Sequence, residues 1–213
     1  MITIIDYDAG NIKSVANMLL ALGVASRISE KPADISTAER LILPGVGHFD
    51  FGMAGLERRD LIGALNDRVL GDGVPVLGIC LGAQLLTRGS AEGEREGLGW
   101  IAGDTVAFDR TRMDGSLRLP HMGWADIWAS QDNPLLESTD KEARFYHVHS
   151  FHMTCDEEQT TILKTHYGYD FTTGIRKQNV LGVQFHPEKS HRFGMELLRR
   201  FSTWIPDAGA MAA

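Results

Sequence analysis

Two short segments of this sequence hold the residue types that a nucleophilic active site needs. The first is GICLG, residues 78–82, which places Cys80 directly after an apolar run with a glycine two positions away on each side. This pattern is typical of a sharp strand-to-helix turn that exposes a nucleophile, because bulkier neighbours would not fit. A helix N-terminus also favours the reactive thiolate. A buried cysteine that acts as a small hydrophobe is the alternative, but it does not require the glycines.

The second segment, GVQFHPEKS at residues 182–190, supplies a base and a carboxylate. A thiol nucleophile needs a proton acceptor, and the acceptor needs a group that fixes its tautomer. His186 ends an apolar run, Pro187 restricts the backbone, and Glu188 can turn back to bond the second ring nitrogen of the histidine. HPE alone is a weak signal, since it is often part of a surface turn. Together with Cys80 it predicts a Cys-His-Glu triad.

Acyl-transfer chemistry at such a triad also needs N–H donors for the oxygen that becomes negatively charged. We expect the N–H of Leu81 as one donor, because it follows the nucleophile. LPGVGHF, residues 43–49, ends another apolar run with glycines on both sides of Val46, so its backbone can approach a ligand closely or reorient. The sequence therefore predicts a second donor from Val46 and Gly47.

The fold must bring these segments together. In the first hundred residues, short apolar runs alternate with segments of helical spacing, which predicts a mostly parallel sheet with helices on both faces. The C-terminal strand ends of such a sheet share one edge, where ligands bind. The expected strands lie near 2–6, 24–28, 40–45 and 74–79, and the expected helices near 11–22, 49–70 and 81–88.

The second half of the chain has a different pattern. From Trp100 to Val183 the apolar runs are short, β-rich and separated by turns, which predicts an antiparallel portion added to the sheet. A final helix is expected over residues 192–204. Because the sequence shows no repeat or linker, we expect a single domain over 1–213, with a disordered tail at 206–213.

The bulk composition excludes several classes of protein. The 213 residues are 43% hydrophobic, as in ordinary globular proteins, and the formal charge of −7 argues against a nucleic-acid surface. Two cysteines are too few for a disulfide framework, and no apolar run approaches the roughly 18 residues of a membrane span. The segment MITIIDYDAG lacks the basic start of a signal peptide. We expect a cytoplasmic protein without nucleic-acid or membrane partners.

Three histidines near the middle of the second half raise the question of a metal site. His147, His149 and His152 lie within six residues. On a strand, His147 and His149 share one face and His152 points to the other. No cysteine or carboxylate completes a ligand set before Asp156. The expectation from sequence is therefore no metal and no cofactor.

Taken together, six motifs resemble those of the class I (triad-type) glutamine amidotransferases, and more narrowly the glutaminase subunits of imidazole glycerol phosphate synthases. The resemblance runs from Ile4 to Phe201 and implies a flavodoxin-like α/β fold. The motifs are DYDAGN, LPGVGHF, GICLGAQ, PHMGW, HVHSF and GVQFHPEKS.

The resemblance also implies an activity. Cys80 would attack the side-chain amide of glutamine and release ammonia, with His186 moving protons and Glu188 orienting it. Ammonia would pass to a (β/α)8-barrel cyclase subunit, in a heterodimer that makes imidazole glycerol phosphate for histidine biosynthesis. The implied glutamine-binding residues are Gln84, Ser150 and Phe151, and the implied interface residues are Tyr146 and His147.

Departures from the family pattern leave other functions open. Asp8 stands where the family has glycine, and His147 where an aromatic residue is usual. The stretches HRFGMELLRRF and EGLGWI also resemble a paralogous branch whose partner converts a sugar acetamido group to an acetamidino group in surface-sugar pathways. Cysteine-elbow peptidases and deglycases of a similar fold carry histidine directly after the nucleophile, where this chain has Leu81. A catalytically inactive regulator would have a broken triad.

Overall fold

Five parallel strands form the half of the sheet that carries the predicted nucleophile. The computed structural model describes residues 1–137 and 142–206. Its parallel strands lie in the order β2-β1-β3-β4-β11. All except the edge strand β2 are buried along most of their length, as expected where helices cover both faces. The parallel strands are β1 (Ile2–Ile5), β2 (Ser26–Ser29), β3 (Arg40–Gly45), β4 (Val76–Cys80) and β11 (Val180–Val183).

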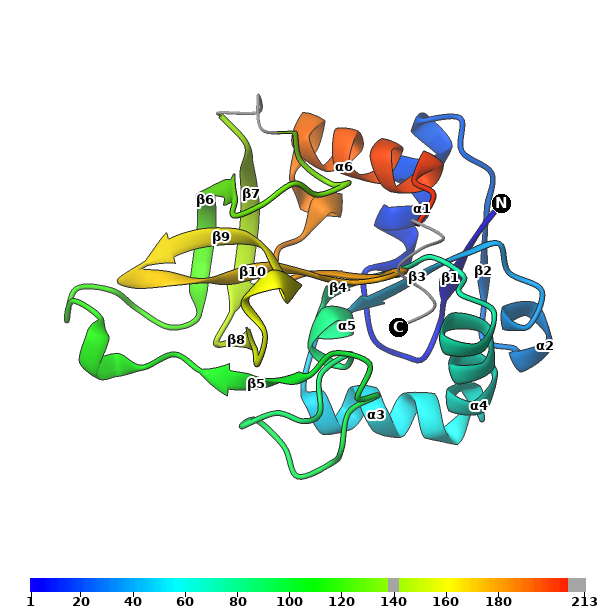
Figure 1. Cartoon of the computed structure of the whole chain (residues 1–213), viewed down its shortest axis with the longest axis horizontal. Coiled ribbons are helices and arrows are strands. Elements are labelled where there is room, and N and C mark those ends of the chain that lie inside the picture. Colours follow the sequence, from blue (N-terminus) through cyan, green and yellow to red (C-terminus); the bar gives the residue numbers. More distant parts are fainter. Residues whose placement is uncertain (138–141, 207–213) are drawn as a thin grey trace.

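Helices pack on both faces of these strands (Figure 1). Because successive strand residues point to opposite faces, Ile4 packs in one core with Leu19 and Phe201, while Ile5 packs in another with Leu56. The helices of the first core are α1 (Ile12–Ala21) and α6 (His191–Thr203), and those of the second are α3 (Phe49–Arg58) and α4 (Leu61–Asn66). Two one-turn helices, α2 (Pro32–Ile35) and α5 (Leu81–Gln84), follow strands β2 and β4.

The second half of the chain extends the same sheet with antiparallel strands. Beyond β11 the order continues β10-β9-β6-β7, and β8 pairs with both β5 and β10. This confirms the predicted mixed sheet with an antiparallel portion. The strands are β5 (Gly103–Ala107), β6 (His121–Ala129), β7 (Arg144–His149), β8 (Phe151–Cys155), β9 (Thr161–Tyr167) and β10 (Tyr169–Lys177).

Several predicted element bounds were wrong. The helix expected over 81–88 ends at Gln84, whose carbonyl accepts a hydrogen bond from the Thr87 hydroxyl at 2.8 Å. The helix expected over 49–70 is divided at Asp60, which adopts a left-handed φ of 54°. The expected disordered tail, 206–213, lies outside the described residues from 207 onward.

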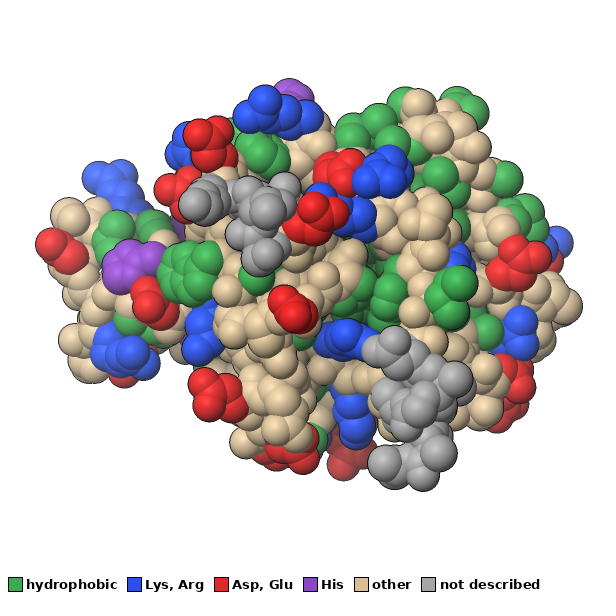
Figure 2. Space-filling view, turned by 45° about the horizontal axis from the view of Figure 1, so that its top comes forward, with side chains coloured by type: hydrophobic (Ala, Val, Ile, Leu, Met, Phe, Trp, Pro, Cys, Tyr) green, Lys and Arg blue, Asp and Glu red, His purple; other side chains and the backbone are tan. Residues whose placement is uncertain are grey.

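The surface carries both signs of charge. On the face drawn in Figure 2, Lys and Arg side chains are interspersed with Asp and Glu, which prevents a large field of one sign there. Among the helices in the described part of the chain, none combines the length and the apolar character needed to cross a membrane.

Candidate active site

Cys80 lies on a strained turn between β4 and α5. Its backbone has φ 53° and ψ −110°, outside the regions that side chains favour. The flanking glycines are required by packing: a methyl group on Gly82 would lie 1.8 Å from the carbonyl oxygen of Leu43, and one on Gly78 would lie 2.7 Å from the Cα atom of Ala83. The sequence therefore folds α5 directly against β3 and β4, and Cys80 is the residue at the bend.

The pair His186 and Glu188 is held directly behind the nucleophile. Nδ1 of His186 lies 2.8 Å from Oε1 of Glu188, and both side chains are almost completely buried. The turn that carries them is fixed to β7, because the His186 N–H donates to the Tyr146 carbonyl at 2.9 Å. The Ser190 hydroxyl adds two contacts: it donates to the His186 carbonyl at 2.6 Å and accepts from the Tyr146 N–H at 2.9 Å.

The electrostatic environment of His186 favours its charged form. Burial alone lowers the pKa of this imidazole, but the negative charges of Cys80 and Glu188 outweigh burial and raise the pKa to about 9. His186 is therefore an imidazolium at neutral pH, between a sulfur and a carboxylate. Because α5 has only one turn, its dipole is small, and the His186 imidazolium is a cation placed to stabilise negative charge on the Cys80 sulfur.

A cavity of about 380 Å³ brings most of the predicted residues together. Glu188 does not line it, since it lies behind His186, and neither Tyr146 nor His147 lines it. The predicted residues that line the cavity are Val46, Gly47, Cys80, Leu81, Gln84, Ser150, Phe151 and His186. Sequence reasoning did not select four further lining residues, which are Glu92, Val148, His149 and Lys189.

Comparison with known proteins identifies the family. The sequence model of the family described as Glutamine amidotransferase class-I matches residues 3–203. This chain belongs to the class-I glutamine amidotransferases. It is therefore a glutamine amidotransferase with glutaminase activity.

Curated relatives match this amidotransferase over nearly its whole length. A Pseudomonas aeruginosa protein named imidazole glycerol phosphate synthase subunit HisH 2 is 44% identical, over 94% of this chain and 98% of its own. A Methanococcus maripaludis protein of the same name is 45% identical over the same shares. Leptospira borgpetersenii has a subunit HisH that is 39% identical over 95% of this chain and 100% of its own.

Solved structures support the same fold. A glutamine amidotransferase crystal structure superposes with a TM-score of 0.73 at 17% identity, covering 93% of this chain and 96% of that one. The structure of PurLQS from Thermotoga maritima superposes with a TM-score of 0.68 at 18% identity, covering 94% and 96%. These likenesses confirm the predicted fold class.

A buried pair of amides links the cavity-lining Gln84 to Cys80 through Gln184, a residue that sequence reasoning missed. Gln84 donates from Nε2 to the Phe151 carbonyl at 3.3 Å and to Oε1 of Gln184 at 3.2 Å. Gln184 in turn donates from its own Nε2 to Sγ of Cys80 at 3.8 Å. The available signal was position, because Gln184 directly follows β11 and stands two residues before His186.

The predicted oxyanion segment divides into a fixed part and a free part. Gly45 pairs with Cys80 across β3 and β4, and a methyl group on Gly45 would lie 2.5 Å from the Tyr7 hydroxyl and 2.6 Å from the Gly82 nitrogen. Gly47 has φ 112°, which side chains rarely adopt, and open space lies around it. The strand end is therefore fixed at Gly45, while the peptide after it has room to turn.

Both departures from the family pattern have structural explanations. Asp8 adopts a φ of 68°, where glycine is ordinarily favoured, and its carboxylate accepts a hydrogen bond from Arg59 at 2.7 Å outside the cavity. His147 is completely buried within β7, so at the predicted interface its side chain would act through its neighbours rather than by direct contact. Tyr146 is partly exposed. Its ring meets the exposed Trp124 ring edge-on, with the two ring centres 6.2 Å apart.

Proposed function

We propose that this chain is the glutaminase subunit of an imidazole glycerol phosphate synthase. The observation that carries the proposal is the single cavity in which Cys80, His186 and Gln84 converge. The names of the relatives at 39–45% identity support the acceptor pathway and favour it over the surface-sugar alternative. The family match over residues 3–203 supports one amidotransferase domain, and the biosynthetic role fits a cytoplasmic protein.

The first half of the reaction forms a thioester. The sulfur of Cys80 attacks the side-chain carbonyl carbon of glutamine, and the carbonyl electron pair moves onto the oxygen. The N–H of Leu81 and the Val46–Gly47 peptide stabilise this oxyanion. His186 then gives its proton to the amide nitrogen, the carbon–nitrogen bond breaks, and ammonia leaves.

The second half consumes water and restores the site. Neutral His186, oriented by the Glu188 carboxylate, takes a proton from a water molecule that attacks the thioester carbon. The tetrahedral intermediate expels the sulfur of Cys80, and glutamate forms. One glutamine and one water thus give one glutamate and one ammonia, with the thiolate–imidazolium pair regenerated.

Glutamine is held by the opposite wall of the cavity. Ser150 and Phe151 lie at the junction of β7 and β8, and Gln84 reaches the Phe151 carbonyl from α5. Ammonia passes to a (β/α)8-barrel cyclase subunit in a heterodimer. We place part of the contact at Tyr146, beside the exposed Trp124 of β6.

Complementation tests the acceptor pathway. The gene is expressed in a histidine auxotroph that lacks its own glutaminase subunit, on medium low in ammonium. We expect growth without histidine, no growth with Cys80→Ala, and recovery of the Cys80→Ala strain when ammonium is added. Glutaminase activity in the cell extract without growth would mean that the ammonia serves a different acceptor.

A second measurement tests the triad with the purified partner present. His186→Ala is expected to lower glutamine-dependent synthesis by at least ~10²-fold, the typical effect of losing a general acid–base group. Synthesis from added free ammonia should stay nearly unchanged. Equal loss of both activities would assign His186 a structural role.

A further inference from the structure

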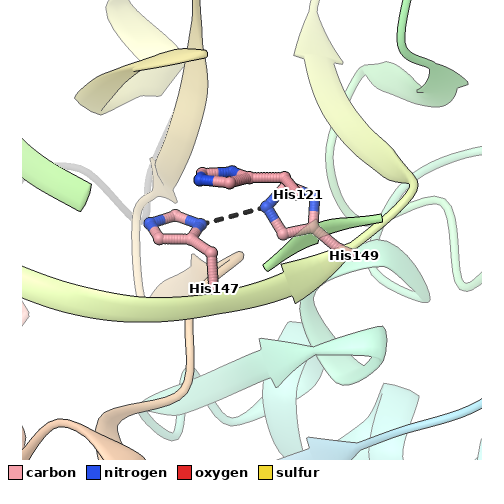
Figure 3. A group of neighbouring side chains, drawn as sticks. All are labelled: His121, His147 and His149. Carbon is pink, nitrogen blue, oxygen red and sulfur yellow. Dashed lines mark hydrogen bonds between the residues drawn. The ribbon is translucent and has the colours of Figure 1, made fainter. Parts of the chain in front are cut away.

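Three buried histidines from two neighbouring strands converge beside the glutamine cavity (Figure 3). His121 of β6 pairs directly opposite His149 of β7, and His147 lies two residues before His149 on the same face. One nitrogen from each ring lies within 4.8 Å of the other two. The sequence grouped His152 with His147 and His149 as possible metal ligands. In the structure His152 bonds the Tyr169 hydroxyl at 2.9 Å and does not belong to the cluster.

The hydrogen bonds fix the tautomer of His149. Its Nδ1 lies 2.7 Å from the Phe151 carbonyl, which can only accept, so Nδ1 carries the proton and Nε2 presents a lone pair. That lone pair accepts from Nδ1 of His147 at 3.0 Å. A backbone carbonyl that orients a histidine in this way is the usual outer contact of a metal-binding imidazole.

Two ring nitrogens of the cluster are left without partners. Within residues 1–137 and 142–206, Nε2 of His147 and Nδ1 of His121 are buried and make no hydrogen bond. Buried polar atoms are rarely left unpaired, because each costs the free energy of its lost hydration. The cluster therefore has more lone pairs than donors to satisfy them.

The surroundings keep the three rings neutral. The His121 ring stacks on Tyr167 with ring centres 4.0 Å apart, and Phe171 contacts both His147 and His149. Burial lowers the pKa of His121 to about 4. Burial, with repulsion from the neighbouring imidazoles, holds the pKa values of His147 and His149 well below the usual range. Neutral imidazole is the form that ligates a metal.

We propose that His121, His147 and His149 form a binding site for a divalent metal ion of the zinc type. Zinc binds histidine nitrogen at about 2.0–2.1 Å in tetrahedral geometry, so two such nitrogens lie roughly 3.4 Å apart. Nδ1 of His147 and Nε2 of His149 are already near this separation, at 3.0 Å. The third nitrogen, from His121, reaches it by a small side-chain rotation. Three imidazoles leave one position for water, and nitrogen donors of this kind suit zinc, copper or nickel rather than magnesium or calcium.

A second pocket, which shares no lining residue with the glutamine cavity, borders the cluster. Its volume is about 420 Å³, and its lining residues include His121, Asp126, His166 and Tyr167. An ion enters there and replaces the hydrogen bond between His147 and His149. The proton of His147 then moves from Nδ1 to Nε2, so no additional nitrogen is left without a ligand or a proton.

The test uses Co²⁺ and Zn²⁺ as probes on the full chain carrying Cys80→Ala, which removes the catalytic thiol as a competing ligand. We expect one Zn²⁺ per chain by calorimetry, and visible absorption bands of tetrahedral Co²⁺. His147→Phe, which introduces an aromatic ring, should weaken binding by at least ~10²-fold, since it removes a ligand outright. His166→Ala removes an exposed histidine that lines the same pocket but does not belong to the cluster, so this variant should bind as before.

The competing outcomes are distinguishable. Binding that is unchanged by His147→Phe, or lost in His166→Ala, would place the ion at the surface and overturn the proposal. Binding seen only when Cys80 is present would assign the ion to the catalytic thiol and overturn it too. Far-UV circular dichroism checks the fold of each variant. If His147→Phe is unfolded, His121→Phe tests the same prediction, because it also removes one ligand and keeps a ring against Tyr167.

Discussion

The side-chain amide of Gln184 donates to the sulfur of Cys80 at 3.8 Å, and its oxygen accepts from Gln84 at 3.2 Å. One buried residue thus contacts the nucleophile and a residue proposed to bind glutamine. A hydrogen bond to a charged group is worth about 1.5–3 kcal/mol, so this donor has a measurable share in stabilising the thiolate. Gln184 is a positioning residue for both groups.

Replacing Gln184 therefore changes the reactivity of Cys80. Gln184→Leu should lower glutamine turnover by roughly 10-fold or more, because the thiolate loses a donor and Gln84 loses an acceptor. Gln184→Glu should slow the alkylation of Cys80 at pH 7, since a carboxylate beside the sulfur opposes negative charge there. Gln159→Ala, an exposed glutamine that bonds Glu157, is the control. An unchanged alkylation rate in both variants would contradict the positioning role.

The two cysteines should differ sharply in reactivity. Burial raises the pKa of Cys155 to about 11, so this residue is a thiol at neutral pH, whereas Cys80 faces an imidazolium. A glutamine-like electrophile at pH 7 should label Cys80 once per chain, as read by peptide mass spectrometry. Cys155→Ser should leave labelling unchanged. Labelling that persists in Cys80→Ala would contradict the assignment of the nucleophile.

The pH dependence of glutamine hydrolysis should respond to Glu188. The proposed proton donor is His186, whose pKa is raised to about 9, so activity should fall as the pH rises through that value. Glu188→Gln removes a negative charge beside the imidazolium and lowers its pKa, which moves the alkaline limb to lower pH. Rates of ammonia release between pH 6 and 10 measure the limb in both proteins. If the pH at which the rate falls is the same in both proteins, a group other than His186 controls the loss of activity at alkaline pH.

The same pKa shift predicts how stability changes with pH. The pKa of His186 is higher in the folded protein than the value near 6.5 of an unfolded chain, so the imidazolium stabilises the fold fully below that unfolded value. This contribution is lost as the pH rises through about 9. Thermal melts from pH 6 to 10 should show a larger decline for the wild type than for His186→Asn. Parallel declines would refute the prediction.

The free subunit should be a poor glutaminase. If the Val46–Gly47 peptide must turn to complete the oxyanion site, the missing donor costs ~10²–10³ in kcat until the partner binds. Ammonia release is compared for the subunit alone, with the partner, and with the partner plus acceptor ligand. Gly47→Ala should change the ratio of the partner-bound rate to the free rate, because a side chain disfavours the φ of 112° from which the peptide turns. Equal rates in all three mixtures would rule out latency.

The structural features that could be predicted from sequence are those fixed by residues close together in the chain. The glycine frame of Cys80 and the HPE turn at His186 each lie within one short segment, so their local geometry could be predicted from the sequence. The apolar runs likewise predicted the parallel strands. The helix after Cys80 was predicted too long because the side-chain bond from Thr87 to the Gln84 carbonyl, at its C-terminus, is not visible in hydrophobic spacing.

Contacts between distant segments could not be predicted in the same way. His121 joins His147 and His149 only because β6 pairs with β7 in one register, and a shift by one residue would separate them. The burial of His147 was missed for a similar reason. The alternation of side chains along a strand shows which residues share a face of the sheet, but it does not show which other elements cover that face. Gln184 needed the fold to place β11 beside β4.

The Ser190 hydroxyl makes the β7 strand and the proton donor a single mechanical unit. It accepts from the Tyr146 N–H and donates to the His186 carbonyl, so a displacement of β7 reaches the imidazole through two short hydrogen bonds. A partner that contacts the Tyr146 end of β7 would therefore reach the imidazole through the serine and also through the direct bond from the His186 N–H to the Tyr146 carbonyl. Ser190→Ala removes the first connection and leaves the second, so it would weaken the coupling between β7 and His186 without abolishing it.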